Sequence, residues 1–208
     1  STLVRQGTRQ LYPMSDGNSS TNEAESAADG ESPLLSVHTE SFAEWLNHVG
    51  VSIAVTTYQA GYTILLRPDE GVVNTHFRQF HRPMGLAFGG GRLALGAARE
   101  LIEFRNMVDV APQVPSHRQP DACYLPRRVH VTGDIDIHEM DYSSEGELWF
   151  VNTRFSCLCT LNEEHSFVPR WLPPFVTGLS PQDRCHLNGL AMVHRQPKYV
   201  TALGATDA

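Results

Sequence analysis

Residues 84–88 read MGLAF and residues 188–192 read NGLAM, so one short apolar segment with a glycine occurs twice in the chain. Gly85 and Gly189 are 104 residues apart, and halfway between them, 52 residues from each, a third segment, IHEM, begins at Ile137. Each segment is followed by a second apolar run, namely RLALGA, ELWFVNT and KYVTALG. A spacing of about 50 residues with several strands in each unit is typical of β-propeller blades. The alternative is chance similarity among short apolar strings.

The first strand-like segments fit the same scheme. Residues 52–66, SIAVTTYQAGYTILL, can be laid over residues 148–161, LWFVNTRFSCLCTL, and both are rich in residue types that favour strands. Residues 59–61 predict a tight connection, and FGGGR at 88–92 predicts a hairpin turn. The segment ELIEFRN, residues 100–106, fits a helix by periodicity alone, but its place in the repeat favours a strand. We therefore expect an all-β fold of antiparallel sheets.

One short helix is expected before these strands. Four large apolar residues recur at helical spacing in SFAEWLNHVG, residues 41–50, and Gly50 is a suitable stop signal. Ser41 and Glu44 match a capping box at its start. The apolar residues are Phe42, Trp45, Leu46 and Val49.

The chain divides into a leader and one domain. Residues 1–38 are mostly small or polar, and we expect them to form a flexible leader. Residues 39–208 are expected to form a partial β-propeller domain. Its expected blade segments are residues 51–67, 84–110, 130–170 and 186–208. Because closed propellers have roughly four to eight blades, we expect an incomplete β-propeller of about three antiparallel blades, with one short N-terminal helix.

The composition excludes some classes of partner. The chain has 208 residues, a formal net charge of -7 and scattered Lys and Arg residues, so we expect no nucleic-acid partner. No apolar run is long enough to cross a membrane and no secretory signal is visible, so we expect no membrane partner. Four cysteines are few for this length and favour a reduced, cytoplasmic location.

Six strings together carry a family resemblance. They are TTYQAG, RPMGLAF, TGDIDIHE, LWFVNTRFSCLCTL, SFVPRWLPPF and DRCHLNGLAM with the later YVTALGATD. With them the chain resembles an uncharacterised bacterial family of conserved hypothetical proteins, domain of unknown function 4915. The resemblance covers about residues 41–208 and implies a propeller-like domain in proteins longer than this chain. It implies no activity, and the difference in length puts in doubt any site that later blades complete.

Two polar segments are candidates for a functional site. In GDIDIHEM, Asp134, Asp136 and His138 alternate with isoleucines, which predicts that the three polar side chains share one face of a strand. In DRCHLNGLAM, His186 stands just before the apolar run. Because His138 and His186 belong to consecutive units, we expect them to approach one another at the propeller axis.

One hypothesis for these residues is a metal centre. Histidine together with Asp or Glu is a common ligand set for a transition metal, and propeller enzymes often place a metal at the axis, by analogy of fold alone. His138 and His186 are the candidate ligands of a divalent transition metal. The candidate catalytic residues are Asp136, Glu139, Arg184 and Asn188, of which Arg184 and Asn188 would contact an anionic substrate.

The alternative hypothesis for the same residues is structural. Buried polar groups are normally hydrogen-bonded, so the carboxylates and histidines would fix the blades in place. Asp183 suits a turn that accepts backbone N–H groups, and Asn188 before a glycine suits the start of a strand. Arg82, Arg127 and Arg128 are candidates for binding carboxylate or phosphate, or else ion-pair partners of the surplus acids.

Two functions therefore stay open. The first is a metal-dependent enzyme that acts on a small polar substrate at the propeller axis. The second is a non-catalytic interaction or scaffold module with structural histidines. The partner is an unknown small molecule or a protein, and whether the chain is an enzyme is left undecided.

Overall fold

The structure is built almost entirely of β-strands. The computed structural model describes residues 2–5, 9–11, 37–114 and 120–207. Its elements are β1 (Thr2–Arg5), β2 (Arg9–Leu11), α1 (Glu40–Val49), β3 (Val51–Thr57), β4 (Tyr62–Asp69), β5 (Val72–Gln79), β6 (Leu86–Gly89), β7 (Arg92–Gly96), β8 (Glu100–Asn106), the 3-10 helix η1 (Ala111–Gln113), β9 (Ala122–Val131), β10 (Ile137–Tyr142), β11 (Leu148–Asn152), β12 (Cys157–Thr160), β13 (Val168–Trp171), β14 (Leu187–Val193) and β15 (Gln196–Ala202).

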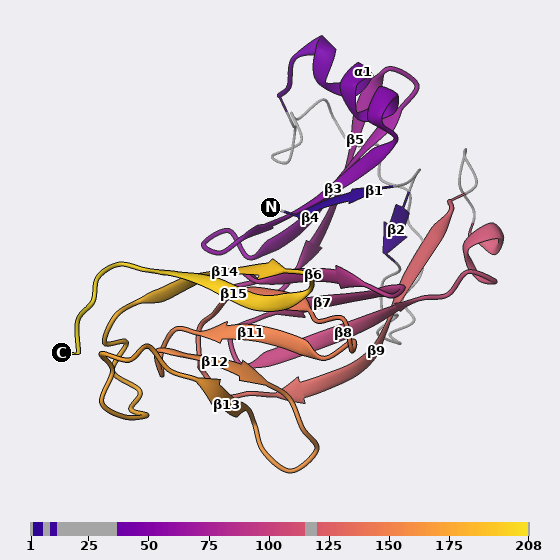
Figure 1. Ribbon diagram of the computed structural model, residues 1–208. Coiled ribbons are helices and arrows are strands. Elements are labelled where there is room, and N and C mark those ends of the chain that lie inside the picture. Colours follow the sequence, from indigo (N-terminus) through magenta and orange to yellow (C-terminus); the bar gives the residue numbers. More distant parts are fainter. Residues whose placement is uncertain (1, 6–8, 12–36, 115–119, 208) are drawn as a thin grey trace, which may run out of the picture.

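The strands form four sheets, which follow one another along the chain from β3 onward (Figure 1). Sheet A has the order β1-β3-β4-β5, sheet B β2-β9-β8-β7-β6, sheet C β10-β11-β12-β13 and sheet D β14-β15. Strand β2 pairs parallel with β9, and the other pairings are antiparallel. Within the described residues, no pairing closes these sheets into a single continuous one. The prediction of an all-β, incomplete propeller-like fold is confirmed.

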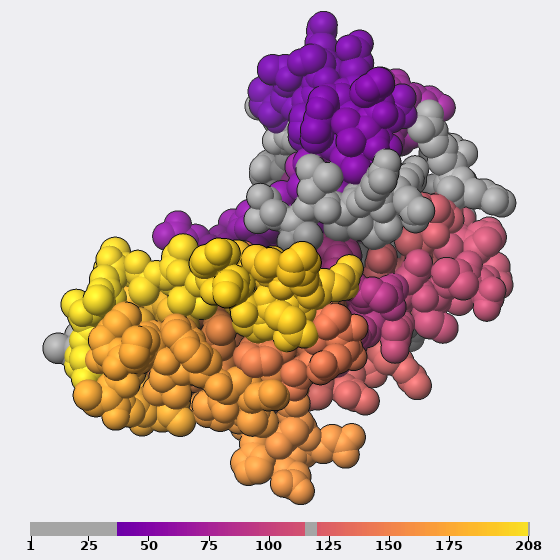
Figure 2. All heavy atoms as spheres, viewed as in Figure 1, coloured from indigo at the N-terminus to yellow at the C-terminus, as the bar shows by residue number. Residues whose placement is uncertain are grey.

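Each sheet shares an apolar core with the next one. One core lies between sheets A and B, a second between B and C, and a third between C and D. In sheet C, Phe150 belongs to the core with sheet B, and the following residue, Val151, belongs to the core with sheet D. Because successive side chains of a strand point to opposite faces, both faces of this sheet are buried. Figure 2 shows the yellow C-terminal segment lying directly against the orange segment of sheet C.

Glycines allow sheets B and C to approach closely. A Cβ atom added to Gly96, at the end of β7, would lie 2.9 Å from Ile137 Cγ2. A Cβ atom added to Gly85 would lie 3.0 Å from Met140 Cε. The first distance is shorter than real Cβ contacts, and the second is tighter than ordinary van der Waals packing. The glycine of the MGLAF segment therefore has a packing role: it leaves room for β10.

The predicted turns and the predicted strand over residues 100–106 are present. Gly90 and Gly91 connect β6 to β7 with φ angles of 56° and 70°, as a two-residue hairpin requires. His194 and Arg195 connect β14 to β15 in the same way, with φ angles of 50° and 58°. Residues 100–106 form β8, so the predicted strand is confirmed and the helical periodicity of this segment was misleading.

The predicted helix is present, but its start and its buried face differ from expectation. Helix α1 begins after Thr39, whose side chain makes no capping hydrogen bond, so the predicted capping box is wrong. Ala43 and Leu46 are its buried residues, whereas the Trp45 side chain is 45% exposed. The helix packs against sheet A, so the small residue Ala43 faces the strands and the indole lies outside. The predicted end at Gly50 is confirmed.

The predicted leader, residues 1–38, lies largely outside the described residues. Within it, β1 pairs with β3 and β2 pairs with β9. None of the described helices is both long enough and apolar enough to span a lipid bilayer.

Candidate functional site

Strand β10, at the edge of sheet C, lies next to the edge strand β6 of sheet B and to β14 of sheet D. His138 is the second residue of β10, and His186 immediately precedes β14. Their rings meet edge to face, with centroids 5.0 Å apart and an interplanar angle of 83°. The expected approach of the two histidines is therefore present in the structure.

Three further residues complete what we call the β10–β14 polar cluster: Asp136, His138, Asp183, His186 and Asn188. Asp183 Oδ2 lies 2.7 Å from His186 Nδ1. Asn188 Nδ2 lies 3.1 Å from His138 Nδ1, and Asp136 Oδ2 lies 3.8 Å from His138 Nε2. When the Asn188 amide donates to Nδ1, neutral His138 carries its proton on Nε2, on the side of Asp136.

The backbone at this cluster is unusual. Asp136, Asp183 and His186 have left-handed φ angles of 57°, 51° and 46°. Residues other than glycine reach this region at a cost of about 1–3 kcal/mol each, and such residues concentrate at functional sites. The Asp183 N–H donates to the Arg154 carbonyl at 2.9 Å, and the Leu203 N–H donates to the Cys185 carbonyl at 3.0 Å. Backbone bonds thus hold His186 in this conformation from both sides.

The left-handed angle of Asp136 also corrects the predicted strand. Alternation over GDIDIHEM predicted that Asp134, Asp136 and His138 share one strand face, but β10 begins only at Ile137. Because the chain turns at Asp136, its carboxylate reaches the ring of His138 from a loop. Asp134 takes a different direction and binds two arginines instead.

The environment of His138 favours its neutral form. Its side chain is 16% exposed, whereas that of His186 is 37% exposed. Burial lowers the pKa of His138 and the charge of His186 lowers it further, while the carboxylates of Asp136 and Asp183 oppose the shift. A neutral imidazole can both donate and accept a hydrogen bond, which suits proton transfer or recognition of a hydroxyl group.

Two candidate residues from the sequence have other partners. Burial raises the pKa of Glu139, and its Oε1 accepts a hydrogen bond from the Met140 N–H at 3.1 Å. Glu139 follows His138 in β10, where the pairing with β11 has a bulge between Ile137 and Met140. Arg184 donates to Asp207 Oδ1 at 2.7 Å and to Thr177 Oγ1 at 3.0 Å. It therefore ties residues near the C-terminus to the preceding loop.

A chain of ion pairs lies beside the cluster and includes Arg82, which the sequence nominated as a partner of carboxylates. Asp134 pairs with Arg82 at 3.2 Å and with Arg154 at 3.4 Å. Arg82 also donates to the Tyr58 hydroxyl at 3.1 Å. Arg82 also has a left-handed φ of 48°.

The arrangement gives no geometric support for a metal. Among the residues that the structure describes, no three His, Cys, Asp or Glu side chains are grouped so that they could hold a metal ion. The Nδ1 atom of His186 is paired with the Asp183 carboxylate, and the Nδ1 atom of His138 is paired with the Asn188 amide. These partners direct both Nδ1 atoms away from a shared metal ligand position.

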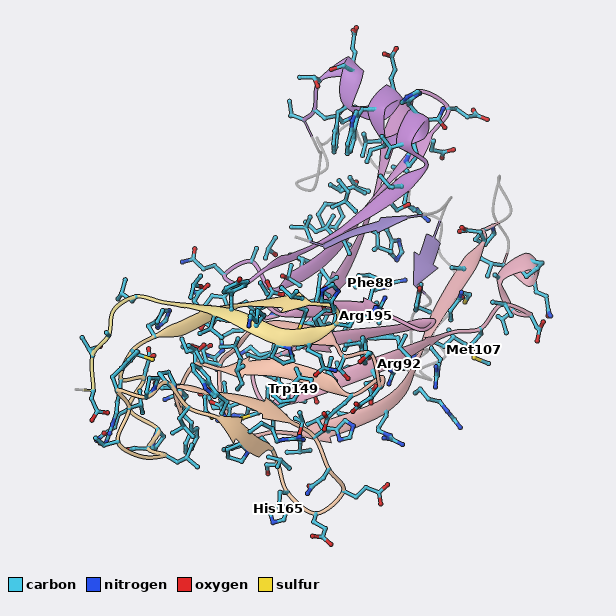
Figure 3. The ribbon with its side chains drawn as sticks, viewed as in Figure 1. Phe88, Arg92, Met107, Trp149, His165 and Arg195 are labelled. Carbon is cyan, nitrogen blue, oxygen red and sulfur yellow. The ribbon has the colours of Figure 1, made fainter. Side chains whose placement is uncertain are left out.

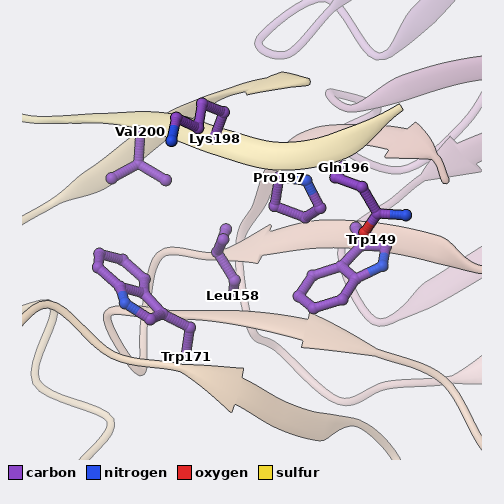
Figure 4. A pocket seen from close by; sticks show the side chains of 7 residues that line it. All are labelled: Trp149, Leu158, Trp171, Gln196, Pro197, Lys198 and Val200. Carbon is purple, nitrogen blue, oxygen red and sulfur yellow. The ribbon is translucent and has the colours of Figure 1, made fainter. Parts of the chain in front are cut away.

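A separate groove of about 380 Å³ lies between sheet C and β15. Figure 4 shows Trp149 and Trp171 on either side of Leu158, with Pro197 and Val200 of β15 above them. The guanidinium of Arg170 stacks over Trp149 at 5.0 Å from the ring centroid. Two partly exposed indoles around an aliphatic floor form an apolar surface of the kind found in protein and ligand contacts.

Comparison with known proteins gives a family and no relative of known function. A search of curated proteins and a search of solved structures each found no significant match. The family model described as "Domain of unknown function (DUF4915)" matches residues 40–208, which include the β10–β14 polar cluster and the groove. The chain therefore belongs to the DUF4915 family of domains of unknown function.

Proposed function

We propose that the β10–β14 polar cluster binds a small polar molecule that carries a hydroxyl or carboxylate group. The observation that carries this proposal is the pair of imidazoles, 5.0 Å apart, at the meeting point of two neighbouring sheets. One ring, that of His138, is the less exposed of the two and its lowered pKa favours the neutral form, while the other, that of His186, is half-buried and paired with Asp183. Such a pair offers a hydrogen-bond acceptor and a donor side by side, which is what a hydroxyl group requires.

This site has the parts needed for acid–base chemistry. His138 is biased towards the neutral form, and Asp183 orients His186 through its Nδ1 atom, as a carboxylate orients a general base in many enzymes. The metal-dependent version of the proposal needs a third ligand, which the described residues do not supply. We therefore favour a metal-free role for the two histidines.

The second candidate is an interaction module with structural histidines. The aromatic groove at Trp149 and Trp171 favours this alternative, because an apolar concave surface suits a protein partner. In that case, the hydrogen bonds of His138 and His186 would serve only to join sheet C to sheet D.

We also infer that the sheets are copies of one repeating unit in a cytoplasmic protein. The repeat is supported by the matching separation of Gly85 from Gly189 and by the two similar hairpin turns at residues 90–91 and 194–195. The cytoplasmic location is supported by the cysteines, since all four are free.

Titration of histidine-labelled protein with small probes tests the binding proposal. Ring signals of His138 and His186 would be followed by ¹⁵N NMR while lactate, tartrate, glycerol and glucose are added in turn. We expect at least one probe to shift both rings saturably, and Asn188→Ala to weaken that response. The exposed His165 serves as the internal control. Rings that respond to none of the probes at millimolar concentration would contradict the proposal and favour the structural alternative.

A further inference from the structure

Four arginines from three neighbouring strands gather around one cavity of sheet B. The cavity has a volume of about 370 Å³ and is lined by Arg92, Glu103, Phe104, Arg105, Arg127 and Arg128. Arg92, labelled in Figure 3, begins β7 and lies directly opposite Arg105 of β8. Like charges in directly opposed positions destabilise a sheet, so this pairing is a cost to the fold.

A bulge in β9 brings two consecutive arginines to the same cavity. Glu103 pairs with Arg128 and the next residue, Phe104, pairs with Pro126, so Arg127 is an extra residue in the strand. In a regular strand, Arg127 and Arg128 would point to opposite faces. The bulge removes that alternation, and both residues line the cavity. Bulges that redirect side chains in this way are common next to functional sites.

The one carboxylate of the cavity is already engaged. Glu103 accepts a hydrogen bond from the Tyr142 hydroxyl at 3.3 Å, and its other oxygen lies 3.3 Å from His130 Nε2. Arg92 lies 4.0 Å from Glu103 Oε2. Burial raises the pKa of Tyr142, with a further contribution from Glu103, so the hydroxyl stays a donor. Glu103 is therefore a poor partner for the remaining arginines.

Backbone carbonyls and an aromatic ring position two of the arginines. Arg92 donates to the Gly146 carbonyl at 2.6 Å, and its guanidinium lies 4.0 Å from the centroid of the Tyr142 ring. Arg105 donates to the Gly90 carbonyl at 3.3 Å. Arg127 and Arg128 are exposed, and neither forms a salt bridge with any residue that the structure describes.

We propose that this arginine cavity binds a phosphate group of a small molecule. Four guanidinium groups and one carboxylate leave a local charge of about +3 in a chain whose net charge is -7. One carboxylate ligand would leave most of that charge uncompensated, whereas a phosphate or pyrophosphate carries two or more negative charges. Guanidinium groups also match phosphate oxygens through paired N–H donors.

This inference is independent of the function proposed for the histidines. His138 lies at the start of β10, whereas Tyr142, which contacts Arg92, lies at its end. The cavity is likewise next to Gly90, beyond the end of β6, whereas Arg82 precedes the start of that strand. The two sites are thus at opposite ends of the same strands.

Calorimetric titration of the 208-residue chain with inorganic pyrophosphate at constant ionic strength tests the inference. The double variant Arg127→Gln/Arg128→Gln removes two exposed charges and leaves the sheet core intact. We expect wild-type protein to bind pyrophosphate with one site, and the double variant to bind at least about tenfold more weakly, as the loss of charged hydrogen bonds requires. The matched control is Arg195→Gln, in the exposed β14–β15 turn labelled in Figure 3, which should bind as wild type does.

Three results would overturn the inference. The first is the absence of a heat of binding at millimolar pyrophosphate. The second is equal affinity in the wild type and the double variant, with thermal unfolding showing that both are folded. The third is competition by acetate as strong as that by phosphate at the same ionic strength, which would mean that the cavity attracts any anion.

Discussion

Residues with left-handed backbone φ angles determine the geometry of the β10–β14 polar cluster. Asp136 interrupts a sequence that alternates like a strand, and this one backbone angle separates Asp134 from His138. Aspartate is among the residue types that tolerate this region, but tolerance does not predict occupancy. The sequence could therefore nominate His138, His186, Asp136 and Asn188, yet it could not foresee that the two aspartates have different partners.

The lowered pKa of His138 predicts how stability depends on pH. In the unfolded chain, a histidine takes up its proton near pH 6.5, whereas folded His138 takes it up at a lower pH. Stability contributed by neutral His138 is therefore complete above about pH 6.5 and is lost as the pH falls towards the folded pKa. We expect wild-type protein to lose more unfolding free energy between about pH 7.5 and pH 5.5 than His138→Gln does, measured by urea denaturation.

The exposed His165 provides the matched control for this measurement. His165→Gln should lose as much stability as the wild type over the same pH range, because that side chain lies in an exposed loop. If the wild type and His138→Gln lose equal unfolding free energy over this pH range, burial does not lower the pKa of His138.

Removing the hydroxyl group of either of two threonines should lower the unfolding free energy, but by unequal amounts. Thr153 is fully buried and donates to the Leu187 carbonyl at 2.6 Å, which joins sheet C to sheet D. Thr56 donates to the Met84 carbonyl at the same distance, but it is only partly buried. Thr153→Val should cost about 1–3 kcal/mol because a buried carbonyl loses its donor, and Thr56→Val should cost less because water can replace the donor. Equal losses in urea denaturation would contradict this ranking.

At the scale of elements, the strands were the easiest part to predict. Strands β7 and β11 fall within RLALGA and ELWFVNT and are largely buried, whereas β15 overlaps KYVTALG although most of its residues are exposed. The helix was predicted, but its buried face only in part: Leu46 is buried and Phe42 packs against the core, whereas Trp45 and Val49 are exposed. Helical spacing identifies a stripe of apolar residues, but which of them faces sheet A depends on how closely the helix can approach the strands.

The close contact between β7 and β10 predicts that a methyl group added at Gly96 lowers stability. Gly96→Ala places a Cβ atom 2.9 Å from Ile137 Cγ2 and 3.0 Å from Ile137 Cβ, so sheets B and C must move apart. We expect a loss of about 1–3 kcal/mol in urea denaturation, as for other overpacked cores. Gly178→Ala is the control: it meets no atom within 4 Å and should change stability by less than about 0.5 kcal/mol. Similar effects of the two variants would mean that β10 does not pack against Gly96.

In the molecule as a whole, each sheet is stabilised by the apolar core that it forms with a neighbouring sheet. Sheets B and C each have an apolar core on both faces, whereas sheet D shares one core, with sheet C. The arginine cavity likewise depends on the packing of the whole molecule. Arg92, Arg105 and Arg128 are scattered in the sequence, and only the pairing of β7, β8 and β9 brings them together.

The four buried cysteines can report the order in which the sheets open. Cys123 lies in sheet B, Cys157 and Cys159 lie in sheet C, and Cys185 precedes sheet D. Because sheet D has one neighbouring sheet, we expect Cys185 to react with iodoacetamide at a lower urea concentration than the others, as read by mass spectrometry of the peptides. Labelling of Cys157 and Cys159 before Cys185 would mean that the sheets are not stabilised by their neighbours in this way.

Strands β10 and β14 bring His138 and His186 together where sheets C and D meet. The most direct measurement is a nuclear Overhauser effect between the ring protons of the two histidines, with the signals assigned from His138→Gln and His186→Gln. A centroid distance of 5.0 Å predicts a cross-peak between the rings in the wild-type protein. If both rings are assigned and no cross-peak is seen between them, His138 and His186 are not neighbours. Strands β10 and β14 would then be apart at this end of the sheets.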